Sequence, residues 1–224
     1  WSGRCVDGTS GGMHVEEEGN VTYCTLDLSR QAHDAYYNGF ANRTLWPLLH
    51  FRLDLVDYTR ETYAGYRRVN ELFAEKLAPE LQDDDIVWIH DYHLIPLAQR
   101  LRERGIGNRI GFFLHVPMPS SDLLGALPEH GELFAALSSY DLVGFQTQRD
   151  LERFQDYVRL HGGGRVVETG LMETAQGRRF RAGAFPIGID AATISQQAVG
   201  AVRKPTVRRL QDSLTGRRLV IGVD

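Results

Sequence analysis

Four residues that can titrate or donate hydrogen bonds follow two strand-like apolar segments. His90 and Asp91 begin the run HDYH after the segment IVWI, His93 ends that run, and His115 follows RIGFFL. In open parallel sheets, ligands bind outside the carboxyl ends of the strands. A carboxylate among imidazoles suits proton transfer or the recognition of sugar hydroxyls. We therefore expect these four side chains to share one crevice.

Each of these residues also has a structural interpretation. A histidine at a strand end is often a satisfied structural residue, and this applies to His90 and His93. Asp91 could instead cap a helix that begins near Leu94. A zinc site built from the four residues is conceivable, but their spacing matches no compact metal motif. Sugar or phosphate recognition is the preferred interpretation, and no metal is predicted.

An aromatic-rich segment, YYNGFANRTLWP, spans residues 36–47 and shows no clear helical or strand period. Its rings are costly to leave in water, so they either pack in the core or line a pocket. In a pocket, the Tyr37 hydroxyl and the Trp46 indole N–H would donate to an anionic group while the rings stack on a sugar. Both donors are neutral, so by themselves they would hold a phosphate weakly.

Strand-length apolar runs alternate with segments of helical period along the chain. Strands are expected at residues 22–28, 86–90, 109–116, 141–146, 182–187 and 218–223. Helices are expected at residues 60–81, 94–104, 132–138 and 191–202, and after a capping box formed by Thr147 and Asp150. Residues 162–176 are expected to form a loop or an irregular hairpin. This alternation with short connections predicts an α/β fold with a Rossmann-like, doubly wound parallel sheet.

The composition excludes several classes of protein. The 224 residues include 25 Lys and Arg against 29 Asp and Glu, and 42% are apolar, which is ordinary for a globular domain. The mild acidity argues against a nucleic-acid partner. No apolar run reaches the roughly 18 residues of a membrane span, so no membrane partner is expected. Cys5 and Cys24 are interpreted as free thiols in a reducing compartment, which predicts a cytoplasmic location. Neither a phosphate-binding loop nor a dinucleotide fingerprint occurs in the required context.

Five ordered segments carry a resemblance to a known family. They are YYNGFANRTLWPLLHFR, VWIHDYHLIPLA, RIGFFLHVPMPSSDLL, DLVGFQT and FPIGID. In this order they resemble the trehalose-6-phosphate synthase family of retaining GT-B glycosyltransferases, with a match over residues 1–224. The resemblance implies an amino-terminal GT-B lobe: residues 1–215 form the acceptor-side lobe without its first strand, and residues 216–224 open the donor-binding lobe. Met118 departs from the family, which commonly has an aromatic residue there. We expect this lobe alone to be inactive.

The resemblance also implies a reaction and its residues. Glucose would pass from a nucleotide sugar, usually UDP-glucose, to glucose 6-phosphate, giving trehalose 6-phosphate with retention and without a metal or other cofactor. Tyr37 and Trp46 match the family's contacts to the acceptor phosphate, and Trp1 matches a tryptophan that lines the acceptor pocket. Asp91 matches the carboxylate at the acceptor sugar and His115 matches the histidine at the donor glucose, which makes these two the expected catalytic residues.

The expected partners are therefore a nucleotide sugar and a sugar phosphate, and a homo-oligomer is an open alternative. Two other functions also stay open. One is glucosyl transfer to another phosphorylated acceptor, such as glycerol 3-phosphate. The other is a non-catalytic protein that senses sugar phosphates.

Overall fold

The chain folds into two units, residues 1–186 and residues 187–224. The structure is a computed structural model, and it describes residues 2–220. Trp1, which is expected to line the acceptor pocket, lies outside the described residues. The boundary between an acceptor-side and a donor-side lobe at residue 215 stays a prediction.

The first unit is built on a six-stranded sheet with the strand order β4-β5-β6-β9-β8-β7. Its strands are β4 (Ile86–His90), β5 (Arg109–Leu114), β6 (Leu142–Phe145), β7 (Arg165–Glu168), β8 (Leu171–Glu173) and β9 (Arg179–Ala184). The first four strands of that order pair in parallel, which confirms the predicted α/β fold with a Rossmann-like sheet. β7 and β8 form an antiparallel hairpin with a register shift, so the expected irregular hairpin is also confirmed.

A separate three-stranded sheet contains the expected strand at residues 22–28. Its strands are β1 (Ser2–Val6), β2 (Met13–Glu18) and β3 (Val21–Ser29), in the order β1-β3-β2. β3 pairs in parallel with β1 and antiparallel with β2. On β3, Leu26 and Leu28 are buried in the core. The sequence therefore identified the strand but counted it among the strands of the parallel sheet, to which it does not belong.

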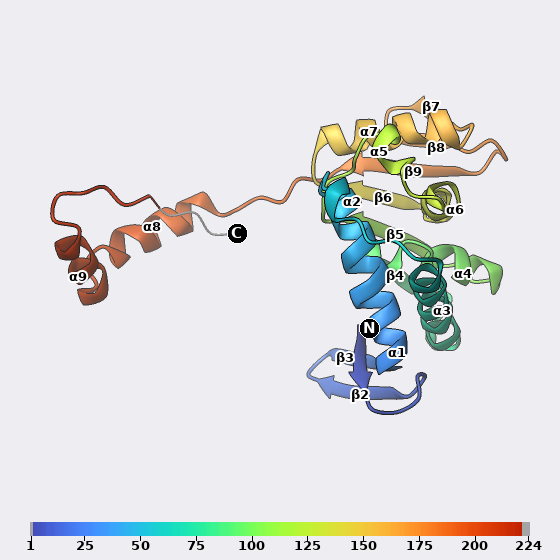
Figure 1. Cartoon of the computed structure of the whole chain (residues 1–224), viewed down its shortest axis with the longest axis horizontal. Helices are drawn as coiled ribbons and strands as arrows, with labels where there is room; N and C mark the ends of the chain where they lie inside the picture. The colour runs from blue at the N-terminus through green and yellow to red at the C-terminus, as the bar shows by residue number, and fades with distance from the viewer. Residues whose placement is uncertain (1, 221–224) are drawn as a thin grey trace. The chain divides into compact units, whose positions relative to one another are not determined.

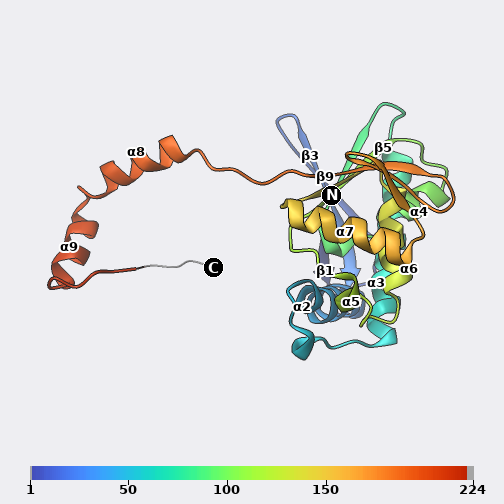
Figure 2. The same cartoon turned by 90° about the horizontal axis from the view of Figure 1, so that it is seen from above.

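Helices and short helical turns connect the strands and cover the sheet (Figures 1 and 2). In chain order within the first unit they are α1 (Arg30–His33), η1 (Asp34–Leu45), α2 (Trp46–Leu49), η2 (Leu53–Leu55), α3 (Arg60–Leu77), η3 (Ala78–Glu80), η4 (Tyr92–Leu94), α4 (Leu97–Glu103), α5 (Ser121–Leu124), α6 (His130–Ala135), η5 (Ala136–Ser139) and α7 (Gln148–His161). Several expected helices are shorter than predicted because proline intervenes. α3 gives way to the 3₁₀ turn η3 around Pro79, and α4 begins only after Pro96.

The aromatic-rich segment at residues 36–47 is helical, although its sequence shows no clear helical period. α1, η1 and α2 form one continuous helical run beside the sheet (Figure 1). Its central part η1 is a π-helix, whose wider turns explain why the apolar residues do not follow the period of an α-helix. η1 packs tightly on α3: a Cβ at Gly39 would lie 2.6 Å from Thr62, and one at Gly65 would lie 2.4 Å from Ala35. These two glycines permit the close approach.

In the described part of the second unit, residues 187–220, there are two helices, α8 (Ala191–Ala201) and α9 (Pro205–Ser213). α8 confirms the helix expected at residues 191–202, apart from its last residue. Of the strand expected at residues 218–223, the described part lacks regular secondary structure, and residues 221–224 lie outside the described residues. Within residues 2–220, no helix has the length and apolarity that crossing a membrane requires.

Candidate active site

The carboxyl ends of β4 and β5 bring three of the predicted residues together. His90 is the last residue of β4 and pairs in register with Phe113. The backbone N–H of Asp91 then donates to the Phe113 carbonyl at 2.8 Å. The backbone N–H of His115 donates in turn to Asp91 Oδ1 at 3.3 Å. His90, Asp91 and His115 therefore share one end of the sheet, as the spacing of the motifs predicted.

Asp91 has a backbone conformation that side chains rarely adopt. Its φ is 69° and its ψ is 169°, a region that is essentially restricted to glycine. Asp91 precedes η4 but makes no capping hydrogen bond with its side chain, so the helix-capping interpretation is wrong. Instead, the carboxylate accepts a hydrogen bond from the backbone N–H of His115, which follows the neighbouring strand β5. Strain of this kind concentrates at functional sites.

His90 and His115 form a pair of imidazoles. His90 Nδ1 lies 2.9 Å from His115 Nε2, at hydrogen-bond distance, and the ring centroids are 5.2 Å apart. Desolvation of the ring and then the neighbouring His115 imidazole lower the pKa of His90, while the Asp91 carboxylate opposes them. His90 therefore favours its neutral form, which can both donate and accept a hydrogen bond.

Tyr37 reaches the same region from η1 through a column of stacked rings. Its ring lies between those of His33 and His93, with centroids 5.2 Å away on each side. The Tyr92 ring continues the column, 4.1 Å from His93. Burial lowers the pKa of His93, and among the described residues its Nε2 has no hydrogen-bond partner. His93 therefore serves as a neutral support for the Tyr37 ring.

Trp46 lies nine residues after Tyr37, at the start of α2. Its ring stacks on His50 with centroids 4.2 Å apart, and His50 Nδ1 lies 2.7 Å from the Trp46 carbonyl oxygen. Both Tyr37 and Trp46 are partly open to solvent, each 41% exposed. The contacts described here bring Tyr37 to the HDYH segment, whereas they tie Trp46 to its own turn.

Buried polar groups of α3 hold the HDYH backbone in place. The Tyr66 hydroxyl donates to the Tyr92 carbonyl at 2.7 Å, and Asn70 Nδ2 donates to the His93 carbonyl at 3.1 Å. The Tyr92 hydroxyl donates to Asn42 of η1 at 3.0 Å. Tyr66 and Asn70 are fully buried, so these bonds are protected from water. They position Asp91 from the side of the core.

The loop after His115 is fixed by α7, a role that the sequence analysis missed. Asp150 Oδ1 accepts the Met118 N–H at 2.9 Å, and Arg153 donates to the Met118 carbonyl at 2.9 Å. Thr147 caps α7 as predicted, and its hydroxyl also donates to Asp150. The Arg153 guanidinium lies 5.0 Å from the centre of the Phe51 ring, which follows α2. α7 thus contacts both the loop of His115 and the turn that follows α2.

The structure does not assemble the four predicted residues into a metal site. Among residues 2–220, no group of three or more His, Cys, Asp or Glu side chains is arranged to hold a metal ion. Cys5 and Cys24 are both free, as predicted.

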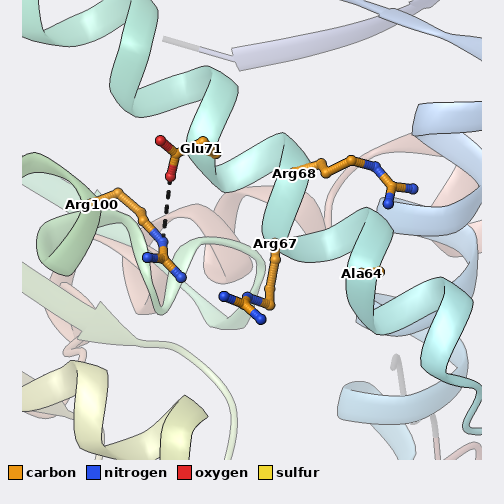
Figure 3. A pocket seen from close by; sticks show the side chains of 5 residues that line it. All are labelled: Ala64, Arg67, Arg68, Glu71 and Arg100. Carbon is orange, nitrogen blue, oxygen red and sulfur yellow. Dashed lines mark ion pairs between the residues drawn. The ribbon is translucent and has the colours of Figure 1, made fainter.

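A cavity on another face has the character of an ion-pair network. It measures about 320 Å³ and is lined by Ala64, Arg67, Arg68, Glu71 and Arg100, as Figure 3 shows. Arg100 pairs with Glu71 at 3.5 Å and with Glu103 at 2.9 Å. Arg67 pairs with Glu132 at 3.4 Å. Two of the three arginines that line the cavity are thus paired with carboxylates, so the cavity gives little reason to move the candidate site away from the strand ends.

Known proteins match the chain over nearly its whole length. The model of glycosyltransferase family 20 matches residues 9–224. A trehalose-6-phosphate synthase of Sinorhizobium fredii is 48% identical over 93% of this chain and 45% of its own length. The crystal structure of an alpha,alpha-trehalose-phosphate synthase (UDP-forming) from Burkholderia xenovorans in complex with glucose-6-phosphate has a TM-score of 0.87 and 45% identity, over 96% of this chain and 48% of that one. An E. coli structure bound with UDP-2-fluoro glucose has a TM-score of 0.88 and 42% identity, over 97% of this chain and 48% of that one.

These similarities define first a class and then a family. The fold and the matched structures make the chain a Rossmann-like α/β lobe of a GT-B glycosyltransferase. The chain belongs to glycosyltransferase family 20. It spans about half the length of the curated relatives that it matches.

Proposed function

We propose that this chain is the acceptor-side part of an enzyme that transfers glucose from UDP-glucose to glucose 6-phosphate, forming trehalose 6-phosphate with retention. The observation that carries the proposal is the junction of Asp91 and His115 at the strand ends, in a chain 45% identical to a synthase with bound glucose-6-phosphate. The relative bound with UDP-2-fluoro glucose supports a UDP-sugar as donor.

In the proposed reaction, the residues of this chain bind and orient the substrates. Tyr37 and Trp46 donate to the phosphate of the acceptor, and Trp1 lines the acceptor pocket. Asp91 binds the acceptor sugar beside its reacting hydroxyl, and His115 binds the donor glucose. A bond forms between the acceptor oxygen and the anomeric carbon as the bond to the diphosphate breaks, and the departing diphosphate oxygen takes the acceptor proton. The protein contributes positioning and electrostatic stabilisation. The proposed reaction uses no cofactor.

The rigidity of the site supports such positioning. Asp91 keeps its strained backbone conformation because the HDYH segment is anchored to α3 and because its carboxylate is bonded to His115. A carboxylate fixed in this way loses little freedom when it binds a sugar hydroxyl, so less of the binding energy is spent on ordering. The cytoplasmic location and a homo-oligomeric state stay predictions.

A hybrid protein tests the proposal. In it, this chain replaces the matching 45% of the Sinorhizobium fredii relative, and the hybrid is incubated with UDP-glucose and with each of two acceptors, glucose 6-phosphate and glycerol 3-phosphate. We expect trehalose 6-phosphate as the product, with its linkage assigned by NMR, and a large loss of turnover in Asp91→Ala at nearly unchanged donor affinity. Preferential transfer to glycerol 3-phosphate, or full turnover by Asp91→Ala, would contradict it.

A further inference from the structure

The imidazole pair at the ends of β4 and β5 has a role beyond holding two rings together. We propose that His90 is a positioning residue, which fixes the tautomer of His115 and so decides whether the outer nitrogen of His115 donates or accepts a hydrogen bond. The consequence for the donor sugar rests on the proposed function. The pairing itself rests on the geometry of this chain.

Two separate bonds determine how His115 is held. Its backbone N–H donates to Asp91, and its ring Nε2 lies 2.9 Å from His90 Nδ1. The strand register places His90 beside Phe113, so these contacts follow directly from the parallel pairing of β4 and β5. The backbone bond sets the position of His115, and the ring bond sets the protonation of its nitrogens.

A hydrogen bond between two imidazole nitrogens needs one proton between them. If His90 Nδ1 carries it, His115 Nε2 is the acceptor, and the proton of a neutral His115 must be on Nδ1. If His115 Nε2 carries it, His115 Nδ1 has a lone pair instead. The two rings are therefore coupled, and the hydrogen bond made by one nitrogen of His115 sets the character of the other.

The groups around His90 favour the neutral ring that the shared-proton bond needs. The titratable groups that act on His90 are His115, which follows β5, and Asp91, which follows β4. Two charged imidazoles in contact would repel each other and could not form the bond, since neither would have an acceptor. Desolvation of His90 also disfavours its charged form, since it lowers the pKa of this ring. His90 is consequently favoured in its neutral form, and the shared bond requires at least one neutral ring of the two.

The tautomer matters for a sugar because a hydroxyl can either donate or accept. With one of the two arrangements of the pair favoured, a donor-sugar hydroxyl meets one fixed partner on His115 and adopts one orientation. Without His90, both tautomers of His115 become populated, and binding must select the competent one. The apparent affinity then falls by the fraction of the competent form. The effect belongs to donor binding, not to the chemical step.

Nitrogen NMR of the 224-residue chain tests the pairing without any substrate. In the native chain, the two ring nitrogens of His115 should show the shifts of a single tautomer. His90→Phe keeps a ring but removes the partner, so the His115 shifts should move toward the average of both tautomers. His90→Asn places an amide near the site of Nδ1 and should restore them in part. His14→Phe, at an exposed histidine of β2, is the control and should leave them unchanged.

Kinetics of the hybrid protein separate this proposal from the proposed function. His90→Phe should raise the KM for UDP-glucose about two- to tenfold, because only a fraction of His115 is then in the competent tautomer, with kcat little changed and partial rescue by His90→Asn. Averaged His115 shifts in the native chain, or shifts unaffected by His90→Phe, would overturn the positioning role. A changed tautomer with an unchanged donor KM would support the pairing and contradict the placement of His115 at the donor.

Discussion

Replacing Asp91 by glycine should stabilise the fold relative to replacing it by alanine. Both substitutions remove the carboxylate and its bond to His115, so they differ only in the backbone at a φ of 69° and a ψ of 169°. Alanine keeps the Cβ that makes this conformation costly, by about 1–3 kcal/mol, and glycine removes it. Glycine also gains freedom in the unfolded chain, which costs about 0.4–1 kcal/mol. The relief of strain should exceed the effect on the unfolded chain, so the glycine variant should be more stable than the alanine variant by about 1–2 kcal/mol.

Urea unfolding followed by tryptophan fluorescence measures this difference. In thermal unfolding, the same difference in stability of about 1–2 kcal/mol corresponds to a difference of about 2–8 °C in Tm for a unit of this length. Asp156 on α7 is the matched control, since its helical backbone carries no such strain. There the order should reverse, with Asp156→Gly less stable than Asp156→Ala by about 1 kcal/mol. If glycine were the less stable choice at residue 91 as well, the conformation of Asp91 would not be strained and this reasoning would fail.

Three further predictions concern the acceptor site, its supports and pH. Tyr37→Phe should weaken binding of glucose 6-phosphate by about 10- to 100-fold and leave glucose unaffected, because one hydrogen bond to a charged partner is lost; equal effects in calorimetry would refute the phosphate role. Arg153→Met should lower the free energy of unfolding by about 1–3 kcal/mol, because it removes the donor to the carbonyl of buried Met118; denaturant unfolding checks this, and no loss would refute it. The pKa of His93 is lowered from 6.5 by burial, so the folded state binds fewer protons than the unfolded chain. Stability should therefore fall as the pH drops below about 6.5, and His93→Phe should reduce that fall, as unfolding at about pH 7.5 and 5.5 would show.

The sequence pattern was sufficient to predict that three candidate residues lie together, because strand ends are defined by local signals. IVWIH and RIGFFL are continuous apolar runs, as expected for buried parallel strands, and the polar HDYH and HVPMP segments follow at their ends. Parallel pairing then brings His90, Asp91 and His115 together without further information. The same local signals identified the Thr147 cap of α7.

Features that depend on tertiary contacts could not be predicted in this way. The π-helix η1 has no α-helical period, and its packing depends on two glycines, Gly39 and Gly65, that appear unremarkable in the sequence. Asp150 was recognised as part of a capping box, but its bond to Met118 joins residues 32 positions apart. The conformation of Asp91 carries no sequence signal, because aspartate is not the residue expected in a region that favours glycine.

Calorimetric titration of the 224-residue chain with glucose 6-phosphate tests the central claim most directly, with glucose and glycerol 3-phosphate as controls. The account predicts weak binding that is selective for glucose 6-phosphate and is lost in Asp91→Ala. Binding that is equal for the three compounds, or stronger for glycerol 3-phosphate, or unaffected by Asp91→Ala, would contradict the assignment of the strand ends as the acceptor site.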